Sequence, residues 1–180
     1  MEPAETLSDG EIRLRRWRRG DARTVHRVVN ASLDHLAPFM PWAVGGYSRA
    51  DAADFIRSSD EEWRAGKAFS YAVLGARGEV IGSCGLMRRI AEGGLEIGYW
   101  LAREHTGRGI ATRAARLLTD EAFRIGARHV EIHHDPANIR SGLIPERLGY
   151  TRIGTMPATQ PGGSAGTGKL VVWRAEVNGC

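Results

Sequence analysis

The sequence predicts a single domain of mixed α/β class that spans residues 1–180. With 180 residues, 42% of them hydrophobic, the chain can form one core of its own, and a second full domain is nearly excluded. Strand-like segments, with an apolar residue at every second position, are interspersed with segments of helical spacing. No internal repeat occurs. Their order is one strand, two helices, three strands, a helix, a strand, a helix and two strands.

The first third of the chain predicts one strand and two helices. Apolar residues alternate with arginines over 11–17, as in a half-buried strand. Asp21 offers an N-cap to a helix over 22–35, whose apolar positions recur at intervals of three and four. A loop rich in Pro, Gly and aromatic residues, 37–46, then leads to a helix over 48–66 that opens on an S-x-x-D start signal.

The middle of the chain predicts three strands followed by a long helix. Period-two alternation marks strands over 69–74, 80–86 and 95–101, and a Gly-containing turn joins the first two as a hairpin. Helical spacing then runs over 110–125 and stops at Gly126, a residue that commonly ends helices. A strand therefore passes into a helix through the short turn between them.

The last third predicts three short strands around one helix. The strands are expected over 130–134, 150–155 and 170–177, and the helix over 138–149. Residues 158–168 form a Gly-rich loop before the final strand.

Cysteine usage and the N-terminus favour a cytoplasmic protein. Cys84 and Cys180 lie far apart and have no metal-ligand spacing, so we expect free thiols in a reducing compartment and no metal site. Residues 1–10 are acidic and polar, so they are expected to be flexible and do not resemble a secretion signal. No apolar run of about 18 residues occurs, so no membrane partner is expected.

The charge balance is mildly basic and dominated by arginine. The formal net charge is +4, and only Lys67 and Lys169 among the 25 basic residues are not arginine. Guanidinium groups suit phosphate and carboxylate partners, although base composition of the genome explains the bias equally well. The densest cluster consists of Arg13, Arg15, Arg16, Arg18 and Arg19. Its alternation with apolar residues favours a solvated strand face over a nucleic-acid site.

The turn between the third central strand and the long helix is a candidate phosphate site. Gly107 and Gly109 precede the helix that begins near Ile110, so unpaired backbone N–H groups gather at the positive end of a helix dipole. Ala111 and Thr112 are small enough to let an anion approach. The dinucleotide fingerprint G-x-G-x-x-G is excluded, because Thr112 stands at its third glycine.

Two blocks carry a family resemblance. The stretch LEIGYWLAREHTGRGIATRAARLLTDEAF, followed by DPANIRSGLIPERLGY, resembles the GNAT superfamily, the Gcn5-related N-acetyltransferases, and within it the RimJ/RimL branch. The resemblance covers about residues 11–177. It implies a mostly antiparallel sheet of six to seven strands flanked by about four helices. It further implies acetyl-CoA as cofactor and direct transfer of the acetyl group to an amine.

The resemblance also implies residue roles. The family's Q/R-x-x-G-x-G/A turn falls on Thr106, Gly107, Arg108, Gly109, Ile110 and Ala111, with Thr106 departing from the pattern. The pyrophosphate of the cofactor is expected on the amides of 107–112, and its pantetheine arm along the strand end that contains Trp100 and Leu101.

In the second block, the resemblance assigns Asn138 to the pantetheine amides and Ser141 to the departing thiol. Pro145 lacks an N–H, and it therefore leaves the carbonyl of Ser141, four residues earlier, without a helical partner. On spacing alone, Asn138 could equally be an N-cap residue with Ser141 incidental.

Transfer to an amine also requires a group that takes its proton. Glu96 is the candidate base, acting through water, because it shares a strand face with Gly98 and Trp100. A structural carboxylate paired with an arginine is the competing reading for Glu96. His133 and His134, on opposite faces of their strand, are alternative bases.

The resemblance therefore implies an N-acetyltransferase, and we expect its acceptor to be a protein N-terminal α-amine, with a ribosomal protein as a candidate partner. An amine-bearing small molecule such as an antibiotic is the alternative acceptor. From another class, a non-catalytic acyl-CoA-binding module or an RNA-associated protein remains open, although no direct nucleic-acid contact is expected. A homodimer is compatible with the sequence.

Overall fold

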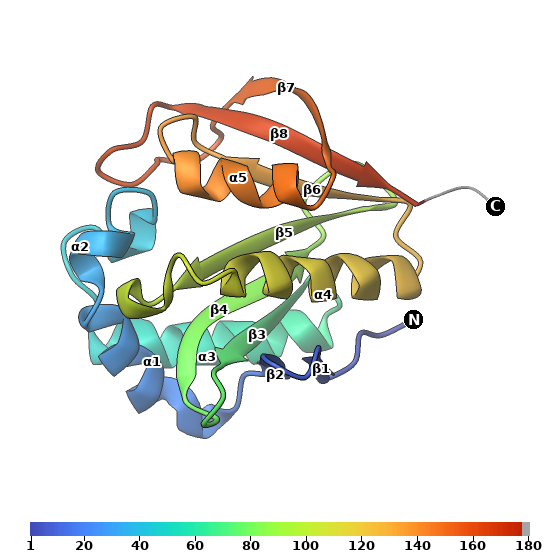
Figure 1. Cartoon of the computed structure of the whole chain (residues 1–180). Coiled ribbons are helices and arrows are strands. Elements are labelled where there is room, and N and C mark those ends of the chain that lie inside the picture. The colour runs from blue at the N-terminus through green and yellow to red at the C-terminus, as the bar shows by residue number, and fades with distance from the viewer. Residues whose placement is uncertain (178–180) are drawn as a thin grey trace.

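The computed structural model describes residues 1–177 and builds them around one eight-stranded sheet (Figure 1). The strand order is β1-β2-β3-β4-β5-β6-β8-β7, and every neighbouring pair is antiparallel except β5 and β6. The strands are β1 (Thr6–Ser8), β2 (Arg13–Arg16), β3 (Ala68–Leu74), β4 (Val80–Met87), β5 (Gly94–Leu101), β6 (His129–His134), β7 (Thr151–Pro157) and β8 (Lys169–Glu176). The α-helices are α1 (Ala22–Asn30), α2 (Leu33–Leu36), α3 (Arg49–Arg64), α4 (Ile110–Arg124) and α5 (Ile139–Arg147).

Helices cover both faces of the sheet, so the domain has two apolar layers. In Figure 1, α4 and α5 lie in front of the sheet and α3 behind it. The layer under α4 and α5 includes Leu86, Ile97, Leu118, Ile132 and Ile144. The layer under α1 and α3 includes Val25, Val29, Ile56, Ala72 and Leu74. Burying each side chain of this size contributes roughly 1.5–3 kcal/mol, so both layers hold the central strands in place.

The strands diverge in the middle of the sheet. β5 and β6 pair in parallel from Gly94 opposite His129 to Ile97 opposite Ile132, and the pairing stops there. β5 continues to Leu101, still paired with β4 on its other side. The half of β5 beyond Ile97 therefore presents a free backbone edge, and we call the opening between it and the end of β6 the wedge.

The N-terminal segment corrects the expectation of flexibility over 1–10. Thr6–Ser8 pairs with β2, which adds an eighth strand to the expected six to seven. Ala4 is fixed as well, because its N–H donates to Glu121 at 2.6 Å and its carbonyl accepts from the Tyr71 hydroxyl at 2.8 Å. Three residues are too few to show a period, so no sequence pattern marks this strand.

The helix expected over 22–35 is divided into α1 and α2. The division lies at Ser32, a buried residue whose Oγ accepts the backbone N–H of Arg103 at 3.1 Å. This contact ties the helix break to the segment that follows β5, and it raises the number of α-helices from the expected four to five.

The Gly-rich loop 158–168 packs on the loop after α2. Ser164 and Ala165 donate their N–H groups to the carbonyls of Ala37 and Pro38, both at 2.9 Å. Gly163 is required at this close approach, since a Cβ there would lie 2.4 Å from the carbonyl of Ala37.

No helix within residues 1–177 is long and apolar enough to cross a membrane. Cys84 is a free, buried thiol, whereas Cys180 lies outside the described residues.

Candidate active site

The turn before α4 has the geometry of an anion cradle. Gly109 is the N-cap of α4 with φ +75°, and Gly107 has φ +74°, a region in which other residues are strained. Within the described part of the chain, the N–H groups of residues 107–112 donate to no backbone carbonyl. They lie at the positive end of a helix of 15 residues. The side chains of the turn stay clear of these amides, since Arg108 is exposed and Thr106 Oγ1 donates to the Arg103 carbonyl at 2.8 Å.

The cradle fits the pyrophosphate expected there. A Cβ built on Gly107 or Gly109 meets no atom within 4 Å, so the space in front of the amides is open. Ile110, Ala111 and Thr112 are half-buried behind it. Open space in front of free N–H groups at a helix N-terminus is the environment that binds phosphate groups.

The wedge supplies a backbone edge beside this cradle. Beyond Ile97, β5 hydrogen-bonds only to β4, so Trp100 and Leu101 can offer backbone groups on the side that β6 leaves. The side chain of Leu101 is buried in the layer under α4. The side chain of Trp100 packs with the layer under α1 and α3, so only its backbone faces the side that β6 leaves.

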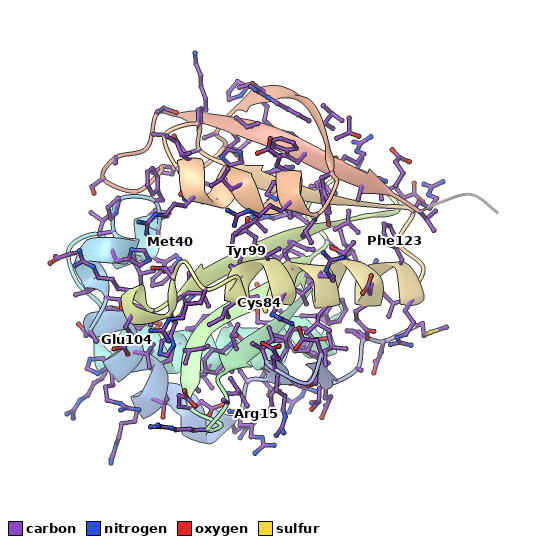
Figure 2. All side chains as sticks on the ribbon, viewed as in Figure 1. Arg15, Met40, Cys84, Tyr99, Glu104 and Phe123 are labelled. Atoms are coloured by element: carbon purple, nitrogen blue, oxygen red, sulfur yellow. The ribbon has the colours of Figure 1, made fainter. Side chains whose placement is uncertain are left out.

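Tyr99 and Ser141 meet on the α4–α5 side of the wedge. Ser141 Oγ donates to the Tyr99 hydroxyl at 3.2 Å, and that hydroxyl donates to the Ser141 carbonyl at 3.1 Å. The carbonyl is the one that Pro145 leaves without a helical partner. Burial raises the pKa of Tyr99 well above its usual value, so its hydroxyl remains protonated. Figure 2 shows Tyr99 between α5 and α4.

Asn138 is the N-cap of α5. Its Oδ1 accepts the backbone N–H of Ser141 at 3.3 Å, so this oxygen supports the helix. The two amide hydrogens of the Asn138 side chain have no partner within residues 1–177 and can donate to a ligand. The capping role and the expected cofactor role are therefore compatible.

Glu96 is held by an arginine that the sequence did not indicate. Arg89 Nε lies 2.8 Å from Glu96 Oε2, and Arg89 Nη2 lies 2.6 Å from Oε1. Glu96 is only 5% exposed, so the guanidinium offsets the cost of burying this carboxylate. The geometry at Glu96 is that of a paired carboxylate, the reading that competed with catalysis.

His133 of β6 lies next to Glu96 of β5, where the wedge begins. Its Nδ1 is 3.7 Å from Glu96 Oε2, and its Nε2 is 2.6 Å from Glu131 Oε2. Glu131 is also bound by Arg174, whose Nη2 lies 2.6 Å from Oε1. Burial alone would raise the pKa of Glu131, but the hydrogen bonds and charges of His133 and Arg174 lower it by a larger amount. The net shift is downward, so this carboxyl is ionised at neutral pH.

His134 points to the opposite face and is fully bonded. Its Nε2 accepts the indole N–H of Trp173 at 3.0 Å, and its Nδ1 lies 2.9 Å from the Asp135 carbonyl. The indole is a donor only, so Nε2 carries the lone pair and Nδ1 the proton. No basic nitrogen of His134 is left for a substrate.

Comparison with known proteins identifies the domain. A family model described as an acetyltransferase (GNAT) domain matches residues 11–151. The chain belongs to the GNAT family. The resemblance predicted from the two sequence blocks is thereby confirmed.

Relatives of this GNAT domain are similar in sequence or in structure. YdaF of Bacillus subtilis, named for ribosomal N-acetyltransferase activity, is 42% identical over 60 residues, 33% of each chain. RimL, an α-N-protein acetyltransferase of ribosomal L7/L12 solved with coenzyme A, has a TM-score of 0.87 at 18% identity over 96% of this chain and 98% of its own. MccE, a microcin C7 self-immunity acetyltransferase solved with acetyl-CoA and AMP, has a TM-score of 0.85 at 20% identity over 94% of each chain.

These matches differ in what they establish. The alignments to the curated relatives YdaF and p20 of Bacillus licheniformis span 33% and 62% of those proteins' lengths. The structural likeness, at identities of 18% and 20%, establishes the shared fold.

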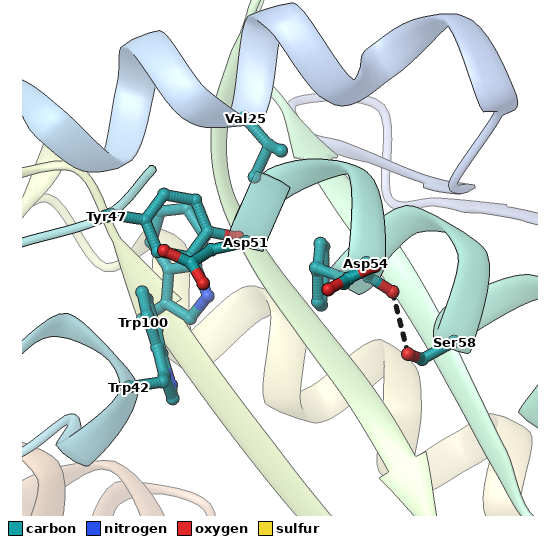
Figure 3. Close-up of a pocket in the computed structure, with 8 residues that line it drawn as sticks. Val25, Trp42, Tyr47, Asp51, Asp54, Ser58 and Trp100 are labelled. Atoms are coloured by element: carbon teal, nitrogen blue, oxygen red, sulfur yellow. Dashed lines mark hydrogen bonds between the residues drawn. The ribbon is translucent and has the colours of Figure 1, made fainter. Parts of the chain in front are cut away.

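A pocket opens beside the GNAT wedge, on the face that carries Trp100 (Figure 3). It measures about 480 Å³ and is lined by Val25, Trp42, Tyr47, Asp51, Asp54, Phe55, Ser58 and Trp100. The rings of Trp42 and Trp100 lie 5.7 Å apart, and those of Trp42 and Tyr47 lie 5.6 Å apart. Burial and the nearby Asp51 carboxylate raise the pKa of Tyr47 to about 12.

Two of the five arginines in the cluster around β2, Arg15 and Arg16, are paired within the domain. Arg15 binds Asp21 at 2.9 Å, and Arg16 binds Asp60 at 2.8 Å and Glu5 at 2.7 Å. These ion pairs leave fewer guanidinium groups for RNA phosphates than the sequence suggests.

Arg89, Glu131 and Arg174 are site residues that were not predicted from the sequence. Glu131 and His133 are two residues apart on one strand and therefore share a face, which is a readable signal. Arg89 lies in the loop after β4. Arg174 lies on β8, which pairs with β6 but follows it in the chain by more than 30 residues, so no local pattern indicates either partner.

Proposed function

We propose that this GNAT domain transfers an acetyl group from acetyl-CoA to the free α-amine of a protein N-terminus. The observation that carries the proposal is the wedge itself. It has free N–H groups at one end, the Tyr99–Ser141 pair on one face, and the Glu96–His133 pair on the other. A thioester placed in the wedge has a proton donor on one side and proton acceptors on the opposite side.

Each group has a role in this reaction. The amides of 107–112 bind the pyrophosphate, and the free edge of β5 with the Asn138 amide orients the pantetheine arm. Acetyl-CoA supplies a thioester carbonyl that an amine can attack directly within a ternary complex. Ser141 donates a proton to the departing sulfur, while Glu96 serves the amine side of the wedge.

The chemistry of amines favours an N-terminal acceptor. An α-amine with a pKa of about 7.7–8.0 is roughly 10–15% neutral at pH 7, whereas a lysine side chain near 10.4 is neutral well below 0.1% of the time. Glu96 is held in an ion pair by Arg89, so an acceptor that loses its proton readily suits this site. The RimL likeness supports the same acceptor class, and a ribosomal protein is the partner that we propose.

We place the reaction in the cytoplasm. The buried thiol of Cys84, which is not in a disulfide, is consistent with a reducing compartment.

A second candidate acceptor is an amine-bearing small molecule. The pocket beside Trp100 has aromatic walls and a volume of about 480 Å³, which is enough for a compact ligand. MccE, a structural neighbour, was solved with AMP beside acetyl-CoA.

Paired peptides test the acceptor. The protein is incubated with acetyl-CoA and peptides that begin with serine or alanine and contain one internal lysine, each made with a free and with a formylated N-terminus. We expect mass spectrometry to find one acetyl group on the α-amine of the free peptides and none on the formylated ones. Acetylation of the lysine in both forms, or of amine-bearing small molecules alone, would reject the N-terminal acceptor.

A further inference from the structure

Five charged or titratable side chains form a continuous chain on one face of the wedge. From the loop after β4 to β8 they are Arg89, Glu96, His133, Glu131 and Arg174. Both carboxylates are 5% exposed, and the imidazole of His133 has a relative exposure of 9%. The formal charges of the two arginines and two glutamates sum to zero.

The hydrogen bond to Glu131 determines which nitrogen of His133 carries the proton. Because Glu131 is ionised, it can only accept, and the 2.6 Å contact therefore requires a proton on Nε2. In the neutral form of the imidazole, Nδ1 then holds the lone pair. It faces Glu96 Oε2 at 3.7 Å, with no proton between the two acceptors. A proton that arrives at Nδ1 would be shared with Glu96 and would place the imidazolium between two carboxylates.

The imidazole stands where the strands separate. Ile132 is the last residue of β6 that pairs with β5, and His133 follows it directly. Ser141 lies on the α5 side of the same wedge, bonded to Tyr99. The proton donor and the lone pair of His133 thus lie on opposite faces of the opening into which the thioester would extend.

We propose that His133 is the general base of the reaction and that Glu131 is its positioning residue. The proposal rests on the proposed acetyl transfer. Nδ1 of His133 takes the proton as the amine nitrogen bonds to the carbonyl carbon. Ser141 gives a proton to the sulfur as the carbon–sulfur bond breaks with its electron pair, and both residues then exchange protons with solvent. Glu96, held by Arg89, stabilises the imidazolium.

Three glutamine variants test this assignment in turnover. His133→Gln keeps a donor for Glu131 but has no base, Glu131→Gln removes the charge that fixes the tautomer, and His134→Gln is the matched control on the other strand face. With a serine-initiated peptide at saturating acetyl-CoA, we expect His133→Gln to lower kcat by about 100-fold and Glu131→Gln by about 10-fold. The KM for acetyl-CoA should change less than twofold in both.

Two comparisons separate a base from a structural residue. The acid limb of the pH profile of kcat/KM should be lost or displaced in His133→Gln and Glu131→Gln, but not in His134→Gln. The deficit of His133→Gln should also shrink with a peptide that carries an aminooxy terminus, because that acceptor is already neutral at pH 7. An equal loss with both acceptors at every pH, or near wild-type turnover in His133→Gln, would overturn the assignment.

A measurement without an acceptor keeps this inference separate from the proposed function. Nitrogen NMR of histidine-labelled protein should show His133 with its proton on Nε2, and that preference should weaken in Glu131→Gln. A proton on Nδ1 in the wild-type protein would overturn the proposal even if the enzyme is active. Because the spectrum needs no turnover, failure of N-terminal acetylation in the peptide assay leaves this result intact.

Discussion

The hydroxyl of Tyr99 satisfies a helix carbonyl that a proline leaves without a partner. Pro145 has no N–H to donate to Ser141, and Tyr99 provides the missing donor at 3.1 Å. The same hydroxyl accepts the proton of Ser141 Oγ at 3.2 Å, so two hydrogen bonds fix one serine. A flexible serine at a helix start thereby acquires a defined position in the wedge.

This pairing predicts that Tyr99 and Ser141 act as a unit. Ser141→Ala should lower kcat severalfold while leaving the affinity for coenzyme A within twofold, because proton donation is needed when the carbon–sulfur bond breaks. Tyr99→Phe should lower kcat in the same direction. The double variant should be no slower than Ser141→Ala alone, because the two residues share one function.

Tyr150→Phe is the matched control for this cycle. Tyr150 is buried, and its hydroxyl lies 2.7 Å from Thr119 Oγ1 rather than on Ser141. Its effect on kcat should add to that of Ser141→Ala. Additive losses for Tyr99→Phe and Ser141→Ala would show that Tyr99 does not act through Ser141.

Sequence reasoning at the residue scale succeeds where the signal is local. The freed carbonyl of Ser141 follows from a proline four residues later, and the structure confirms it. The carboxylate partners of His133 and the arginine bound to Glu96 come together through strand pairing. Their contacts depend on sheet order, which local periodicity does not determine.

At the scale of elements, the short β1 strand depends on one buried carboxylate of α4. Glu121 is 4% exposed, accepts the Ala4 N–H at 2.6 Å and binds Arg124 through two contacts of 2.6 Å. Burial alone would raise the pKa of Glu121, but the hydrogen bonds from Arg124 and Ala4 lower it by a larger amount, so the net shift is downward.

A lowered pKa in the folded state gives a pH dependence with a definite sign. Glu121 stabilises the fold at pH values above 4.5, the pKa of this carboxyl in the unfolded chain. That stabilisation is lost as the pH falls through its lower pKa in the folded protein. Glu121→Gln should therefore lower the free energy of unfolding at pH 7 by about 1–3 kcal/mol. The deficit should narrow as pH falls below 4.5, as urea unfolding at a series of pH values can measure.

Glu61→Gln, an exposed change on α3, provides the control and should alter stability little at any pH. A deficit of Glu121→Gln that stays constant from pH 7 to about pH 3 would show that the carboxylate charge does not hold β1.

The predicted elements agree with the structure wherever the periodic pattern is long. The strands over 69–74, 80–86 and 95–101 and the helix over 110–125 are confirmed almost to their ends. The break at Ser32 and the strand at Thr6–Ser8 were missed, because each depends on a contact with a distant segment.

At the scale of the whole molecule, the reaction site exists because one parallel pair interrupts an antiparallel sheet. β5 and β6 are the only parallel neighbours among the strands of residues 1–177, and their pairing ends halfway along β5. The helix that connects them, α4, brings its N-terminal turn to the open end of the wedge (Figure 1). Cradle, backbone edge and proton-transfer groups are therefore consequences of one topological feature.

The proposed reaction requires coenzyme A to bind at the turn before α4, and calorimetric titration of coenzyme A tests this binding most directly. Gly109→Val should raise the dissociation constant at least tenfold, about 1.4 kcal/mol, because the side chain covers the amides. Gly126→Val is the matched control, since Gly126 ends the same helix at φ +97° with equally open surroundings. The control should bind within twofold of the wild type. Unchanged affinity in folded Gly109→Val, or an equal loss of affinity in both variants, would contradict binding of coenzyme A at this turn.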